Sequence, residues 1–139
     1  MSTINATNIV ADALVGNTSA NAITVRGEGS ATTSLQQGLC KVFSTADTSS
    51  SNTVVSSHNT ASITDINTGV IDTNFTSAMS NGDYHEQAIA DASLGDYTIG
   101  NTTDVHSTAS KSRSYNVRRD NGALLDEPKA GVSIFGDLA

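Results

Sequence analysis

The chain has 139 residues, a formal net charge of −7 and a pI of about 4.5. Its length predicts one domain, with room for an appendage, and its acidity argues against nucleic-acid binding through a broad basic surface. No apolar run approaches membrane-spanning length, and residues 1–5 lack the basic and apolar regions of a secretory signal.

Large apolar residues are scarce. Leu, Ile, Val and Phe make up about a fifth of the chain, near the lower limit for autonomous folding, while charged residues are only 15%. The apolar residues fall in alternating runs, which favours half-buried β-strands over disorder. A chain this poor in apolar bulk gains by burying part of it against its own copies, so we expect an oligomer.

Residues 1–37 carry short apolar clusters separated by Asn, Thr, Ser, Ala and Gly. Residues 8–15 could form one or two helical turns, and residues 22–26 alternate as a strand. This segment cannot close a core alone. It is either a contact segment for other chains or a flexible tail. The apolar residues that we expect to make such contacts are Ile4, Ile9, Val10, Leu14 and Val15.

Residues 34–38 lead into the main domain, and residues 39–44 and 53–58 are predicted as strands around a polar loop at 45–52. Cys40 is the single cysteine, so it cannot form an internal disulfide. We expect it to behave as a small buried apolar residue in a protein made in a reducing cytoplasm.

Residues 62–92 form the most legible stretch. Residues 67–69 (Asn-Thr-Gly) tolerate positive φ, as a tight hairpin turn requires. Beyond the turn, Ile71, Thr73 and Phe75 fall on one face, and Val70, Asp72 and Asn74 fall on the other. A second turn at residues 80–82 precedes another alternating strand from Tyr84.

The remaining chain alternates short strands and turns. Strands are predicted at residues 97–100, 105–109, 111–119 and 132–136, with Pro128 in a loop that cannot be helical. Short strands at this spacing indicate an antiparallel sandwich or barrel.

From Leu35 onward the chain resembles the small β-sandwich knob of phage tail-fibre-like proteins, which are common in phages of marine bacteria. The resemblance rests on four segments: the opening residues 1–4, the strand at 38–43, the hairpin with the Asn-Phe-Thr-Ser-Ala-Met strand end and the following Asp-Tyr at 62–84, and the closing strand at 132–136. It implies an all-β, homotrimeric protein. Residues 1–37 would be the extended attachment segment, and residues 38–139 a jelly-roll-like antiparallel sandwich.

The resemblance also implies a non-enzymatic structural protein of a phage virion. Because the chain has no long shaft, we expect a trimeric capsid-surface decoration (cement) protein or a short head projection. Its partners would be its own copies and the major capsid protein or other virion proteins, without nucleic acid, membrane or cofactor. The alternative is a tail-fibre tip that recognises a host cell-surface glycan, which would need an exposed aromatic platform.

Three further patterns bear on chemistry. Asp83, His85 and Glu86 are metal-capable, but neighbouring strand residues point to opposite faces, so only a trimer axis could gather copies of one His around an ion. A basic stretch could meet an acidic capsid surface or an anionic glycan, or pair with Asp120, Asp126, Glu127 or a neighbouring subunit. Neither a nucleophile elbow nor a phosphate-binding Gly loop is present, so no catalytic residue is assigned. The basic stretch comprises Lys111, Arg113, Arg118 and Arg119, and we take the last two as interface candidates.

Overall fold

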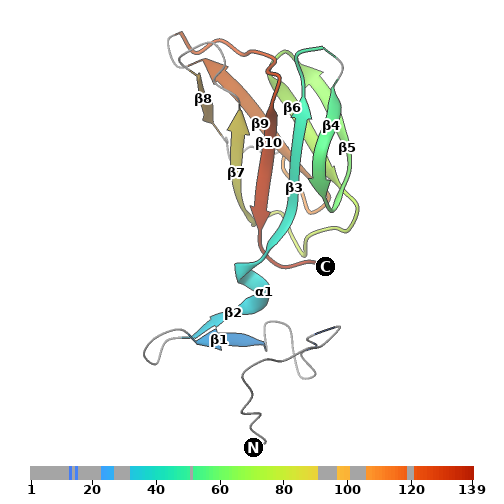
Figure 1. The fold of residues 1–139 in the computed structure, drawn as a ribbon, viewed down its shortest axis with the longest axis vertical. Helices are drawn as coiled ribbons and strands as arrows, with labels where there is room; N and C mark the ends of the chain where they lie inside the picture. The colour runs from blue at the N-terminus through green and yellow to red at the C-terminus, as the bar shows by residue number, and fades with distance from the viewer. Residues whose placement is uncertain are drawn as a thin grey trace, which may run out of the picture.

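The computed structural model describes residues 13, 15, 23–26, 32–50, 52–90, 97–100, 106–118 and 121–139. These residues contain ten strands and one short helix (Figure 1). In chain order the elements are β1 (Thr24–Arg26), β2 (Thr32–Ser34), α1 (Leu35–Gly38), β3 (Cys40–Asp47), β4 (Thr53–His58), β5 (Thr60–Asn67), β6 (Val70–Phe75), β7 (His85–Ala90), β8 (Tyr97–Gly100), β9 (Lys111–Arg118) and β10 (Ala130–Phe135).

Two four-stranded antiparallel sheets form a β-sandwich. The first has the strand order β4-β3-β10-β7 and the second β5-β6-β9-β8. The predicted all-β antiparallel sandwich is therefore confirmed. The predicted hairpin is confirmed as well: β5 pairs with β6 across a turn in which Gly69 has φ +67. Its faces are also as expected, because Ile71, Thr73 and Phe75 point into the sandwich.

Consecutive strands of the sandwich are connected in two ways. The pairs β3–β4, β5–β6 and β8–β9 are neighbours within one sheet, whereas β4–β5, β6–β7, β7–β8 and β9–β10 pass from one sheet to the other. The jelly-roll-like arrangement stays a prediction. β5 and β6 are neighbours because only Thr68 and Gly69 separate them. A two-residue turn returns the chain beside the strand that it has just left.

The edge of the sandwich formed by β4 and β5 is closed by a single residue. Asn59 alone separates the two strands, which belong to different sheets, and its φ of 53 lies in the left-handed region that Asn tolerates better than most residues. The Asn59 side chain donates to Ser77 O (3.0 Å) and accepts from Ser77 N (2.7 Å). These two bonds fix the corner against the segment that follows β6.

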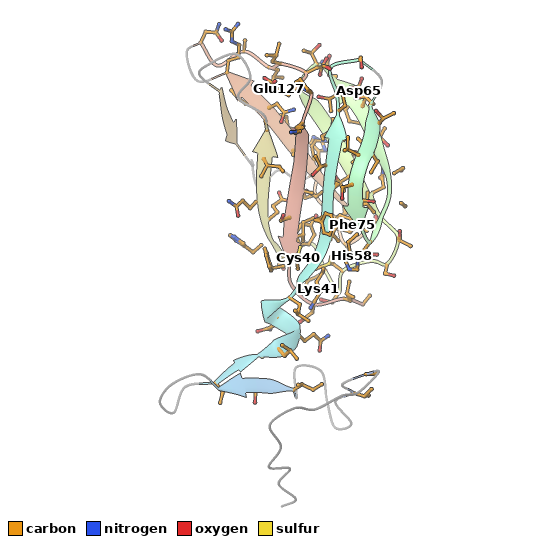
Figure 2. All side chains as sticks on the ribbon, in the orientation of Figure 1. Cys40, Lys41, His58, Asp65, Phe75 and Glu127 are labelled. Carbon is orange, nitrogen blue, oxygen red and sulfur yellow. The ribbon has the colours of Figure 1, made fainter. Side chains whose placement is uncertain are left out.

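The interior combines an apolar cluster with buried polar residues. The apolar cluster lies nearer to α1, where Phe75 is seen in Figure 2, and consists of Val42, Phe75, Met79, Val132 and Ile134 with Tyr84 and Ala88 packed against it. Farther along, the inner faces of the sheets hold Ile71 and Ala46 together with four buried polar residues, Ser44, Thr73, Ser112 and Ser114. The Ser44 and Thr73 hydroxyls meet across the sheets at 3.2 Å.

The short elements β1, β2 and α1 lie beyond one end of the sandwich, the end that also holds the C-terminus (Figure 1). β1 pairs with β2, and the Ser34 hydroxyl accepts from Gln37 N (3.3 Å) as the N-cap of α1. The strand predicted at residues 22–26 is confirmed in β1. The helical turns predicted at residues 8–15 lie outside the described residues, apart from positions 13 and 15.

Two local predictions were wrong. The predicted strand at 105–109 is instead, over its described part, a tight turn before β9, closed by Thr108 N donating to Lys111 O (2.8 Å). The loop predicted from Thr45 begins only after Asp47, because β3 runs on to pair with β10 and β4. Cys40 is half-buried, and its thiol donates to Val42 O (3.1 Å).

Candidate functional site

Most of the predicted attachment residues lie outside the described part of the chain. Of the apolar set, only Val15 is described, and its side chain is 81% exposed. Arg118 is the last residue of β9 and is half-buried. Its backbone N–H donates to Ala123 O (2.8 Å). The attachment hypothesis for these residues therefore stays a prediction. Ile4, Ile9, Val10, Leu14 and Arg119 are outside the described residues.

Two members of the basic stretch, Lys111 and Arg113, pair with one carboxylate. Arg113 donates to Asp72 from Nε (2.6 Å) and from Nη2 (2.9 Å), and Lys111 Nζ lies 2.7 Å from Asp72 Oδ2. For Lys111 and Arg113 a carboxylate is therefore the partner, as expected in kind, but it is Asp72 and not Asp120, Asp126 or Glu127. The register explains it, since Asp72 lies opposite Arg113, and Lys111 lies opposite Asn74, two residues along β6 on the same face.

Asp72 itself is buried, at 3% exposure, on the outward face of β6. Burial alone would raise the pKa of its carboxyl group, but the hydrogen bonds and charges of Arg113 and Lys111 together hold that pKa below its ordinary value. The same contact raises the pKa of Arg113. The three side chains form a bidentate ion pair with a second cation, which is a structural clamp between β6 and β9.

A second polar cluster lies where β7 faces β9. Glu86 accepts a hydrogen bond from the Ser112 hydroxyl, and Tyr84 donates to Lys111 O (2.7 Å). Burial raises the pKa of Glu86 above its ordinary value, an effect that the Ser112 bond partly offsets, and burial raises the pKa of Tyr84 to about 12. These groups tie the first sheet to the second.

The metal hypothesis finds no preformed site within one copy of the described chain. His85 is exposed whereas Glu86 points inward, in line with the expected alternation. No three His, Cys, Asp or Glu side chains gather at metal-binding distance among the described residues. A histidine cluster on a trimer axis is a matter for the assembled protein and stays a prediction.

A pocket of about 350 Å³ opens at the end of the sandwich nearest α1. Figure 2 shows Lys41, His58, Cys40 and Phe75 toward this end of the sandwich. The His58 ring stacks on Phe43, with centroids 6.0 Å apart and planes 24° from parallel. The pocket is lined by Lys41, His58, Asn59, Thr76, Ser77 and Leu138.

The pocket walls are held by backbone and side-chain bonds. The Asn59 carbonyl accepts from Thr76 N (3.0 Å), which adds to the two bonds between Asn59 and Ser77. On the opposite side, Lys41 Nζ donates to the carbonyl of Gln36 in α1. The sequence analysis assigns no role to His58 and misses this site. The available signal was an Asn between two polar strands, a place where a positive φ and a sharp corner are favourable.

No protein-family model, curated protein or solved structure matches the chain. Within the described residues, the single helix has four residues, far short of a membrane span.

Proposed function

We propose that this protein is a non-enzymatic structural component of a bacteriophage virion, a homotrimeric capsid-surface decoration (cement) protein or short head projection. The observation that carries the proposal is the layout of the chain. A small sandwich is preceded by a slender connector of β1, β2 and α1 at one of its ends (Figure 1). This layout suits a knob whose N-terminal segment is attached to a larger particle.

The composition of the interior also supports assembly with other copies. Small polar residues are buried in the sandwich beside apolar ones, and the buried apolar cluster has five members. Several apolar side chains remain exposed, among them Val15 and Ile89. Burying such side chains contributes about 1.5–3 kcal/mol each, and repeated copies acting together multiply the effect.

The test is to locate the protein on the assembled particle and to measure its mass in solution. We expect density on the capsid shell and a trimeric mass by light scattering. A location on the tail would refute the decoration proposal, and a monomeric mass would refute the trimer.

Matched variants then test the attachment segment. Val15→Asp places a charge in the predicted contact segment, and Val55→Asp places one on β4 of the sandwich, where the valine is 64% exposed. We expect Val15→Asp to weaken binding to particles that lack the protein, while Val55→Asp leaves it unchanged. Equal binding by both variants would show that Val15 does not contribute to the attachment interface.

One observation favours the second candidate, a tail-fibre tip that binds a host glycan. The exposed stack of Phe43 on His58 is an aromatic platform of the kind such a tip requires. Binding of the isolated protein to host cells, lost on mild periodate oxidation of the cell surface, would favour this candidate.

A further inference from the structure

We infer that the pocket at the α1 end of the sandwich binds a saccharide unit bearing a carboxylate, of the uronic-acid type. The inference concerns the ligand of one pocket and does not depend on where the protein sits on a particle. It goes beyond the proposed structural role, because it assigns the sandwich a small-molecule site.

The size and lining of the pocket favour a single polar ring. A volume of about 350 Å³ lies at the lower end of the range for small-molecule sites. Such sites combine apolar surface with a few converging polar groups. Here Leu138 supplies apolar surface, and His58, Thr76 and Ser77 supply the polar groups.

Those polar groups are available to a ligand. Within the described chain, the recorded hydrogen bonds engage the backbone of Thr76 and Ser77 but not their hydroxyls, and the His58 ring makes only its stack with Phe43. Two hydroxyls and an imidazole can donate to and accept from the hydroxyl groups of a sugar. Phe43 behind His58 keeps the imidazole plane fixed as a flat wall for the sugar ring.

The charge of the pocket favours an anion. Lys41 is the one charged side chain in the lining, in a protein whose net charge is −7. Its ammonium group gives one hydrogen bond to Gln36 O, and an ammonium has three protons to donate. A carboxylate on the ligand would complete this donor set with a charge-assisted bond.

The walls are already in place without the ligand. Asn59 holds residues 76 and 77 by three hydrogen bonds, at a corner that its positive φ makes sharp. Lys41 is held against α1 from the other side. A pre-organised site loses less entropy on binding than one that must order itself.

The test is an NMR titration of the full chain with sodium D-glucuronate, D-glucose and inorganic phosphate. We expect saturable amide shifts centred on His58, Asn59, Thr76 and Ser77 with glucuronate. Glucose lacks the carboxylate and therefore the charge-assisted bond, so it should bind roughly tenfold more weakly than glucuronate. Equal binding of glucose would overturn the role of Lys41. Equal binding of phosphate would overturn the saccharide assignment, and no saturable shift with glucuronate, or shifts centred elsewhere, would overturn the site.

His58 lies at an exposed strand end, and His58→Ala removes the ring that forms one flat wall of the pocket. The affinity for glucuronate should fall roughly tenfold or more. Thr64→Ala, an exposed threonine on β5 outside the pocket lining, is the matched control and should bind as the parent does. Both variants must give the parent's dispersed spectrum. A folded His58→Ala variant with unchanged affinity contradicts the inference.

Discussion

The Ser44 hydroxyl in β3 and the Thr73 hydroxyl in β6 lie 3.2 Å apart and join the two sheets through a buried hydrogen bond. Both residues are essentially inaccessible, at 1% and 0% exposure. The centre of this sandwich is therefore held by a matched polar pair, where most sandwiches place two apolar side chains. Such a pair is stable only while both members are present.

A double-mutant cycle tests this pair. Ser44→Ala should lower the free energy of unfolding by about 1–3 kcal/mol, because it leaves the Thr73 hydroxyl buried without its partner. Adding Thr73→Val should recover most of that loss, since both polar groups are then gone. Urea unfolding of the four proteins measures the coupling. Additive losses would show that the two hydroxyls act independently.

Ser112 and Ser114 give a second comparison on one strand. Both are buried in β9, but Ser112 donates to Glu86, whereas the Ser114 hydroxyl finds no hydrogen-bond partner among the described residues. Ser112→Ala should destabilise by about 1–3 kcal/mol. Ser114→Ala should be neutral or stabilising, because it removes a buried hydroxyl that has no hydrogen-bond partner among the described residues. Thermal unfolding of both variants separates the two cases, and equal losses would contradict the assignment.

The Asp72 clamp predicts a pH dependence. The folded-state pKa of Asp72 is lowered, so its contribution to stability is fully present above the unfolded value near 3.8 and is lost as the pH falls through the lower folded value. Asp72→Asn should therefore cost about 2–3 kcal/mol at pH 7, and the difference from the parent should shrink below pH 4. Asp65→Asn, at an exposed carboxylate, should change stability by no more than about 0.5 kcal/mol. A pH-independent difference for Asp72→Asn would contradict the clamp.

Substitutions at two glycines distinguish the cost of backbone strain from the cost of steric contact. Gly69 and Gly122 have φ of +67 and +70, but a Cβ on Gly69 would lie 2.5 Å from Leu125 N, whereas one on Gly122 would meet nothing within 4 Å. Gly122→Ala should cost about 1–2 kcal/mol from the left-handed conformation alone. Gly69→Ala should cost more, because the turn must also move away from residue 125. Chemical denaturation of the two variants gives the difference, and equal costs would show that the turn shifts freely.

Local patterns in the sequence were enough to predict most of the strands. The alternation from Val70 to Phe75 and the turn before it gave both the hairpin and its buried face. The pairing of distant strands was out of reach, because the contact of β3 with β10 depends on packing that no local pattern records. In β9 the polar residues Ser112, Ser114 and Asn116 are buried, so the apolar alternation around Tyr115 does not mark the inner face.

The candidate site was harder to predict for the same reason. Its lining comes from β3, the β4–β5 corner, the segment after β6 and the chain end, and no two of these parts form a motif. The sequence analysis expected Lys111 and Arg113 to pair with carboxylates, but it did not name Asp72 among them. The partner follows from strand register, and register between β6 and β9 is set across a long sequence separation.

The one-residue corner at Asn59 has a mechanical consequence. The two sheets are joined there by a backbone link of one residue, whereas on the opposite side β7 and β8 are joined through six intervening residues. Breathing of the sandwich should therefore begin at β7 and β8, and their amide hydrogens should exchange with solvent sooner than those of β3 and β6.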